Sequence, residues 1–119
     1  MGGWLPAEQV RITPLAGPPP LAAWTGTWQL QDGQIRLQAR GDRLHGTGET
    51  IWQGAGTVNT GDFEADARPV GNRVEFAADP APNGCRLSLT LIEDVLAVID
   101  NHACGGLNVT FSGLYARAR

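Results

Sequence analysis

The sequence predicts an all-β protein, a single eight-stranded antiparallel up-and-down β-barrel with one disulfide. Three observations support this fold class. The chain of 119 residues contains 16 Gly and 8 Pro, a composition that favours tight turns over long helices. From Trp24 onward, apolar and polar residues alternate with period two, as they do in strands with one buried face. The chain also has two cysteines, a pair suited to stapling a small domain.

The first predicted hairpin lies at the start of the alternating region. Asp32-Gly33 is a favoured two-residue turn. Closing the hairpin there sets Leu30 opposite Ile35 and Trp28 opposite Leu37. Both pairs are apolar and share one face, and a shift of one residue would destroy that match.

A turn at Gly41-Asp42 predicts the second hairpin in the same way. It sets Gly46 opposite Leu37 and Gly48 opposite Ile35. A glycine facing a large side chain suits the narrow interior of a small barrel, because two bulky residues would not both fit. We therefore expect both glycines to point inward.

The remaining turns complete the predicted strand set. The Gly-rich stretch 53–61 is expected to link the third strand to the fourth. A turn at Gly71-Asn72 sets Ala67 opposite Phe76, and a turn at Glu93-Asp94 continues the alternation. Short links favour sequential pairing, and closure into a barrel removes exposed edges, although a β-sandwich is the main alternative. The expected strands are 24–31, 34–40, 43–52, 62–70, 73–78, 85–92, 95–100 and 107–116.

The chain is expected to divide into an arm and one domain. Residues 1–22 contain four prolines from Pro14 to Pro20, which predicts an extended, polyproline-like arm. The arm is either a loose tail, which we favour, or a segment that docks on a partner. Residues 23–119 form the predicted barrel domain.

Cys85 and Cys104 are predicted to form a structural disulfide. The hairpin register places Cys85 opposite His102, one diagonal step from Cys104, which is near enough for a bridge. A metal site that also uses His102 and His45 is one alternative, and two buried free thiols are another. Because no Cys-x-x-Cys or His-x₃-His spacing occurs, we expect no metal.

Composition excludes several partner classes. The net charge is −3 and all nine basic residues are Arg, without a basic cluster, so we expect no nucleic-acid partner. No apolar run is long enough to cross a bilayer as a helix. The disulfide indicates a periplasmic or secreted protein, although this chain shows no signal peptide of its own.

Two motifs resemble those of the calycins, the group that includes lipocalins, avidins and bacterial inhibitors of secreted metalloproteases. They are Gly26-Thr27-Trp28 on the first predicted strand and Arg117 just after Tyr115 on the last. The resemblance implies that Gly26 and Trp28 lie at the closed end of the barrel, with Arg117 over the indole ring as the barrel floor. Residues 104–115 also resemble small exported bacterial proteins of unknown function, which implies export.

No catalytic signature is recognised in the chain. Phosphate loops, dinucleotide fingerprints, nucleophile elbows and zinc-protease motifs are missing from the sequence, so we expect a protein that is not an enzyme and needs no cofactor. Glu64 and Asp66 share a strand face, which we interpret as a solvated charged surface. Asp100 could orient His102 for acid–base chemistry, but no nucleophile lies beside them. We expect these two residues to hold the loop that carries the disulfide.

The sequence therefore favours a binding role. A small apolar ligand at the barrel mouth is the first expectation, and an inhibitor or adaptor of a secreted hydrolase, acting through loops or the arm, is the alternative. An enzyme using Asp100 and His102 ranks last. The predicted inward side chains are bulky, which leaves little room for a deep cavity. The candidate mouth residues are Trp52, Phe63, Phe76, Asp100, His102 and Asn108.

Overall fold

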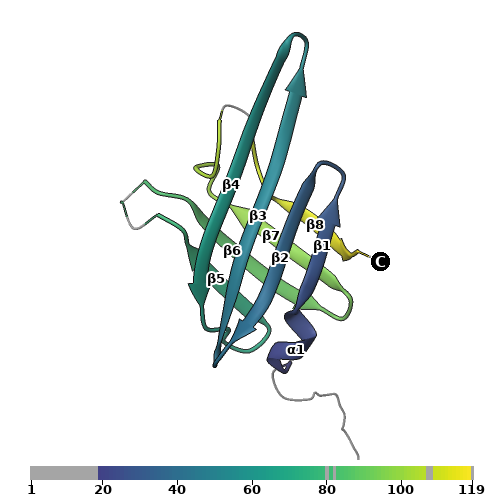
Figure 1. The fold of residues 1–119 in the computed structure, drawn as a ribbon, viewed down its shortest axis with the longest axis vertical. Coiled ribbons are helices and arrows are strands. Elements are labelled where there is room, and N and C mark those ends of the chain that lie inside the picture. The colour runs from purple at the N-terminus through teal and green to yellow at the C-terminus, as the bar shows by residue number, and fades with distance from the viewer. Residues whose placement is uncertain (1–18, 80, 82, 107–108, 119) are drawn as a thin grey trace, which may run out of the picture.

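The structure, a computed structural model, describes residues 19–79, 81, 83–106 and 109–118. Its eight antiparallel strands form one sheet in the order β4-β3-β2-β1-β8-β7-β6-β5, which curls into a nearly closed barrel (Figure 1). The predicted fold class is thus confirmed, while most of the predicted arm lies outside the described residues. The elements are α1 (Leu21–Trp24), β1 (Gly26–Leu30), β2 (Gly33–Arg40), β3 (Arg43–Gly54), β4 (Thr57–Ala67), β5 (Arg73–Ala77), β6 (Arg86–Ile92), β7 (Val95–Asp100) and β8 (Gly113–Arg117).

The register of the first hairpin corrects the prediction. Trp28 lies opposite Ile35, and Leu30 lies opposite Gly33. The expected partners, Leu37 for Trp28 and Ile35 for Leu30, were therefore wrong by two residues. Because a shift of two keeps every side chain on its original face, the inward set is unchanged.

The cause of this shift is the packing around Gly33. The turn occupies Gln31 and Asp32, and Gln31 adopts a left-handed φ of 46°. Gly33 instead begins β2 and points inward, where a Cβ would lie 2.8 Å from Tyr115 Oη and 3.3 Å from Thr50 Oγ1. The Asp-Gly pattern resembles a turn, but the glycine is needed for close packing in the interior.

The second hairpin follows the prediction. Gly46 pairs with Leu37, and Gly48 pairs with Ile35. A Cβ at Gly46 would lie 2.8 Å from the ring of Phe76. The glycines therefore leave room for aromatic side chains that cross the barrel from other strands.

The predicted link at residues 53–61 was wrong. β3 and β4 pair continuously as far as Gly54 and Thr57, so the turn occupies residues 55–56. Gly54 provides space that the ring of Trp52 fills. The resulting hairpin projects well beyond the end of the β1–β2 hairpin (Figure 1).

β4 and β5 do not form the predicted ladder, since they lie at the two ends of the sheet. A bridge joins Val70 to Arg73 around the expected turn, but the predicted pair Ala67–Phe76 is not formed. Pro69 lies between β4 and this bridge and has no N–H to donate to a ladder. The two strands therefore diverge and leave a seam in the barrel wall.

The loop after β7 closes the upper part of this seam. Asp62 N–H donates to Cys104 O at 3.1 Å, and Gly61 forms a bridge with Gly105. The predicted disulfide between Cys85 and Cys104 is present. It ties the loop on the edge of β4 to the residue before β6, so the bond spans the seam between the two ends of the sheet.

The last strand is shorter than the predicted 107–116, because β8 covers only Gly113–Arg117. Phe111 N–H donates to the Asp100 carboxylate at 2.8 Å, which takes this backbone group out of the ladder. Tyr115 and Phe111 are nevertheless buried, as their alternation predicted. No helix among the described residues is long and apolar enough to cross a membrane.

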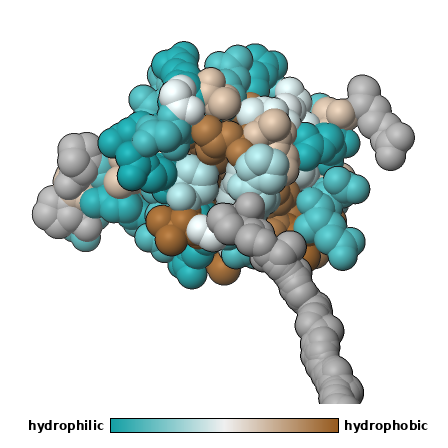
Figure 2. All heavy atoms as spheres, turned by 90° about the horizontal axis from the view of Figure 1, so that it is seen from below, coloured by the Kyte–Doolittle hydropathy of each residue, from teal (hydrophilic) through white to brown (hydrophobic). Residues whose placement is uncertain are grey.

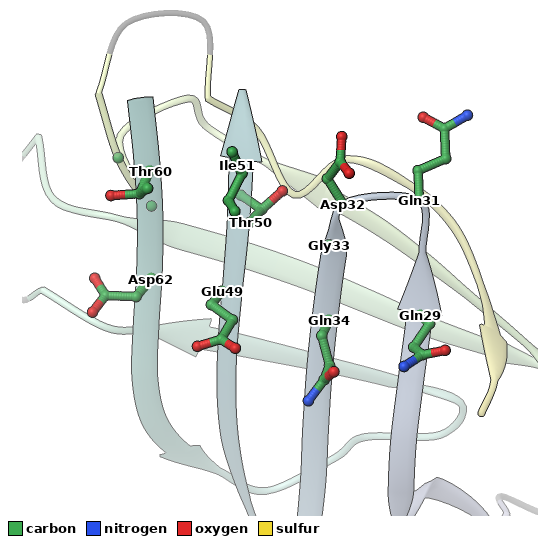
Figure 3. Close-up of a pocket in the computed structure, with 12 residues that line it drawn as sticks. Gln29, Gln31, Asp32, Gly33, Gln34, Glu49, Thr50, Ile51, Thr60 and Asp62 are labelled. Atoms are coloured by element: carbon green, nitrogen blue, oxygen red, sulfur yellow. The ribbon is translucent and has the colours of Figure 1, made fainter. Parts of the chain in front are cut away.

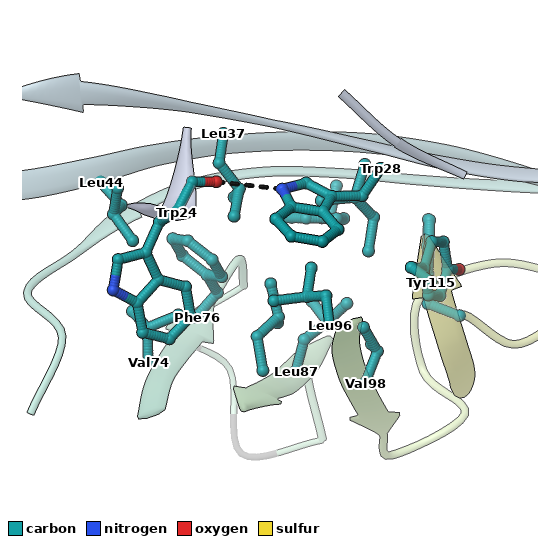
Figure 4. Close-up of a cluster of buried hydrophobic side chains, with 14 of the residues drawn as sticks. Trp24, Trp28, Leu37, Leu44, Val74, Phe76, Leu87, Leu96, Val98 and Tyr115 are labelled. Atoms are coloured by element: carbon teal, nitrogen blue, oxygen red, sulfur yellow. Dashed lines mark hydrogen bonds between the residues drawn. The ribbon is translucent and has the colours of Figure 1, made fainter. Parts of the chain in front are cut away.

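Helix α1 closes the lower end of the barrel. The sequence predicted that Trp24 begins the first strand, but Trp24 is the last residue of α1 and β1 begins at Gly26. Trp24 is fully buried at the end of α1, and its carbonyl accepts a 3.0 Å hydrogen bond from Trp28 Nε1 (Figure 4). The Arg117 guanidinium lies 4.3 Å from the centroid of the Trp28 ring. These three side chains form the barrel floor.

Aromatic side chains fill the middle of the barrel. The ring centroids of Phe63 and Phe76 are 5.8 Å apart, and those of Phe63 and Phe111 are 5.3 Å apart in an edge-to-face arrangement. Trp52, a candidate mouth residue, is half-buried and lies nearer the upper end. The interior is therefore occupied by side chains below that end.

Candidate functional site

The upper end of the barrel, opposite α1, contains a hollow that we call the mouth. Its volume is about 180 Å³. Residues 30–33 of the β1–β2 hairpin, residues 50–52 of β3 and residues of the segment before and within β8 form its walls. Apolar contacts come from Leu30, Ile51 and Trp52, so the mouth combines aliphatic and aromatic surfaces.

Two hydroxyl groups lie at the inner side of the mouth. Tyr115 Oη and Thr50 Oγ1 are the atoms nearest to the vacant Cβ position of Gly33, and both residues line the hollow. Burial, followed by the negative charge of Asp100, raises the pKa of Tyr115 from 10.0 to about 12. The phenol therefore stays neutral at physiological pH and keeps its hydrogen as a donor.

A wider cleft of about 640 Å³ continues from the mouth over the outer surface. It shares residues 31–33 and 50–51 with the mouth. Gln29, Gln34, Glu49 and Asp62 form one row across β1–β4, since each pairs with the next, and Figure 3 shows this row below the turn. The entrance to the mouth is thus polar and carries negative charge.

Asp100 supports the wall of the mouth from inside. Its Oδ1 accepts hydrogen bonds from the hydroxyls of Thr110 at 2.7 Å and Ser112 at 3.2 Å, and its Oδ2 accepts one from Phe111 N–H. Thr110 and Ser112 both line the mouth. The carboxylate therefore fixes the segment that carries two polar wall residues, since charged hydrogen bonds of this kind are comparatively strong.

The other predicted mouth residues are distributed differently. Phe63 and Phe76 belong to the packed interior and do not line the mouth. His102 is exposed with φ of 62°, and its backbone N–H donates to Asp100 at 3.2 Å. Asn108 lies outside the described residues. Among the six candidates, Trp52 lines the mouth directly and Asp100 supports it.

Sequence reasoning did not single out Leu30, Thr50 or Tyr115 as mouth residues. Thr50 carried a readable signal, because it is a polar residue at an inward position of its strand. Leu30 and Tyr115 look like ordinary core residues in the alternating pattern. Their role depends on β3 and β4 extending past the β1–β2 turn, which local sequence did not reveal.

A second polar cluster lies on the outer wall around His45, whose position in the alternation of its strand points outward. His45 is in fact buried, with Nδ1 2.6 Å from Asp66 and Nε2 3.1 Å from Glu64. Glu64 and Asp66 are exposed, as expected for a solvated charged face, whereas the imidazole that the two carboxylates flank is buried. Since they lie on opposite ring nitrogens, they do not converge on one point, and no metal-binding group of three or more such residues occurs in the described part of the chain.

Comparisons with known proteins do not identify a family. No protein-family model matches this chain, and neither a curated protein nor a solved structure is significantly similar to it. The functional inference therefore depends on the geometry of the mouth and of the barrel surface.

Proposed function

We propose that this protein binds a small, mainly apolar molecule in the mouth of the barrel and has no catalytic role. The observation that carries the proposal is the hollow lined by Trp52, Leu30 and Ile51, with Tyr115 and Thr50 at its inner side. Binding sites for small molecules commonly combine apolar walls with a few convergent polar groups. The packed interior limits the ligand to the mouth and its adjoining cleft.

The polar groups define the chemistry of the ligand. The neutral phenol of Tyr115 can donate one hydrogen bond, and the hydroxyl of Thr50 can donate another. A ligand with a flat apolar body and a carbonyl or ether oxygen at its buried end would match both the indole and the hydroxyls. The carboxylates of Asp32, Glu49 and Asp62 around the cleft disfavour anionic ligands, because like charges repel across so short a range.

Two further parts of the proposal concern the class and location of the protein. We assign the barrel to the calycin type, because Gly26-Thr27-Trp28 begins β1 and Arg117 lies over the Trp28 ring. A periplasmic or secreted location is supported by the Cys85–Cys104 disulfide, since such bonds persist mainly in oxidising compartments.

Binding of a neutral fluorescent probe, N-phenyl-1-naphthylamine, tests the proposal. We expect its emission to rise on addition of the protein and its affinity to fall about tenfold in Trp52→Ala, since removing a stacked aromatic side chain costs about 1 kcal/mol or more. Val58→Ala is the matched control, because Val58 is exposed on the same hairpin and does not line the mouth. Equal affinity of the wild type and Trp52→Ala would place the probe elsewhere and refute the mouth as its site.

The β3–β4 hairpin favours a second candidate function, inhibition of a secreted hydrolase. It projects beyond the barrel (Figure 1). Ile51 and Val58 on this hairpin are exposed. A projecting hairpin can enter a protease cleft, where its backbone and apolar side chains make contact. Assays against a panel of secreted proteases test this function, with loss of inhibition in Val58→Asp as the expected signature.

A further inference from the structure

The outer surface of β6, β7 and β8 is apolar, although it faces away from the core. Ile99 is 69% exposed, Leu114 65%, Ile92 53% and Val95 37%. These residues are neighbours in the sheet, because Ile92 pairs with Val95, and Ala97, which lies between Val95 and Ile99, pairs with Leu114. We call this surface the outer apolar face. β7 is thus apolar on both sides, which a solvent-facing strand does not require.

The opposite wall of the barrel has the reverse character. Below the projecting end of the β3–β4 hairpin, where Ile51 and Val58 are exposed, the outward positions of β2, β3 and β4 carry Arg, Gln, His, Thr, Glu and Asp side chains. Arg86 marks one end of the outer apolar face, and the turn at 93–94 marks the other. Between these two ends, the described outward residues of β6, β7 and β8 are Ser, Thr, Ala, Val, Ile and Leu. Seen from the end at which α1 lies, hydrophobic residues are visible along the lower side of the molecule and also near its middle, within a mostly hydrophilic surface (Figure 2). Depletion of charge over an apolar centre is typical of a contact surface.

Charges of opposite sign lie at the two ends of this face. Arg86 begins β6 beside the Ile99 end, and its guanidinium donates to the carbonyl oxygens of Asp79 and Ala81, which leave its positive charge in place. Glu93 and Asp94 form the turn at the other end. Within β6–β8 and their turn, the face is therefore positive at one end, uncharged in the middle and negative at the other end. On the bordering strand β5, Arg73 and Glu75 form an ion pair with each other at 2.8 Å.

This arrangement is complementary to itself. A two-fold axis lying in the plane of the contact and crossing β7 at Ala97 would exchange the two ends of the face. Val95 of one copy would then lie over Ile99 of the other, and Arg86 would lie over Glu93 and Asp94. Isologous contacts of this kind require one surface patch that matches its own rotated copy.

We propose that two copies of this chain associate through the outer apolar face, with their β7 strands related by this axis. The uncharged centre allows two molecules of net charge −3 to meet without burying like charges, while the ends attract each other. A second copy of this chain matches both the outer apolar face and its order of charges, because it carries the same surface.

The size of the face limits the strength of the contact. Three strands about 4.8 Å apart, with five to seven residues each at about 3.3 Å per residue, cover roughly 300 Å² of sheet. Stable complexes bury about 800 Å² on each partner. The dimer is therefore weak and forms reversibly, at concentrations near or above roughly 100 μM.

Sedimentation velocity of the full chain over a wide concentration range tests this proposal. We expect the weight-average mass to rise from monomer toward dimer for the wild type and to stay monomeric for Ile99→Arg. Val58→Arg is the matched control, because Val58 is 61% exposed and lies on β4 in the projecting hairpin, outside β6–β8, so it should associate like the wild type. A wild type that stays monomeric at about 1 mM, or an Ile99→Arg variant that still associates, would overturn the proposal.

Charge reversal tests the orientation of the two copies. Glu93→Lys with Asp94→Lys should weaken association at low salt at least tenfold, and Arg86→Glu alone should do the same. An equimolar mixture of the two variants should recover association, because each mixed dimer restores both opposite-charge contacts. If the mixture stays monomeric while both variants keep the wild-type circular dichroism spectrum, the two-fold arrangement is wrong.

Discussion

The guanidinium of Arg117 lies over the indole of Trp28, 4.3 Å from the ring centroid. Its Nη2 donates to Ala23 O at 2.7 Å, and its Nη1 donates to Thr25 O. One side chain from the last strand thus contacts the first strand, the helix α1 and the residue that joins them. The arrangement fixes the floor by joining segments from both ends of the barrel sequence.

Replacement of Arg117 should therefore destabilise the whole barrel. We expect Arg117→Ala to lower the free energy of unfolding by roughly 2 kcal/mol, because it loses the cation–π contact and two charged hydrogen bonds. The free energy of unfolding of Arg117→Lys should lie between those of the wild type and Arg117→Ala, since an ammonium group cannot stack on the indole and bond both carbonyls in the same way. Urea unfolding measures both, and Arg36→Ala on the outer wall should change stability by less than about 0.5 kcal/mol.

The two buried tryptophans of the floor should respond differently to the same substitution. Trp28 Nε1 donates to Trp24 O, whereas Trp24 Nε1 is buried without a hydrogen-bond partner among the described residues. Trp28→Phe should cost roughly 2 kcal/mol, because it also leaves a buried carbonyl unpaired. Trp24→Phe should cost under about 1 kcal/mol, since it removes an unpaired donor. Equal losses in urea unfolding would contradict this account.

The disulfide should stabilise the closure of the seam between β4 and β5, and not only the β6–β7 hairpin. Chain-entropy estimates for the 19-residue separation of Cys85 and Cys104 give about 3 kcal/mol of stability. Replacing both cysteines by serine should remove this amount. It should also speed hydrogen exchange at the amides of Asp62 and Gly106, which bond across the seam. The serine variant should be insensitive to reductant, and unchanged exchange at these two amides would mean that the seam closes without the bond.

Alternation and turn residues predicted much of this fold. The pairing of Gly46 with Leu37 and of Leu91 with Leu96 follows from residues close in sequence, because a turn fixes the register of its own hairpin. The disulfide followed from the same register. Local pattern was sufficient wherever each strand pairs with its neighbour in the chain.

The errors arose where distant residues decide the local structure. Gly33 resembles a turn glycine, but the hydroxyl of Tyr115 from the last strand occupies its side-chain space. Phe111 alternates like a strand residue, but the Asp100 carboxylate takes its N–H. The mouth is built from such long-range contacts, which explains why sequence alone named Trp52 and Asp100 as candidates but not Leu30 or Tyr115.

Ionisation of Tyr115 should be coupled to unfolding at high pH. Its pKa is raised from 10.0 to about 12 by burial, and secondarily by the charge of Asp100. A raised pKa means that the folded state favours the neutral phenol, so this stabilisation is complete below pH 10 and is lost as pH rises through 12. The chain has one Tyr, so the change in absorbance at 295 nm with pH reports this group above a tryptophan background that does not titrate. We expect Tyr115 to titrate near pH 12 in the folded protein and near pH 10 in urea. Tyr115→Phe should reduce the loss of stability between pH 10 and pH 12. A midpoint near pH 10 in the folded protein would show that the phenol is not shielded from solvent.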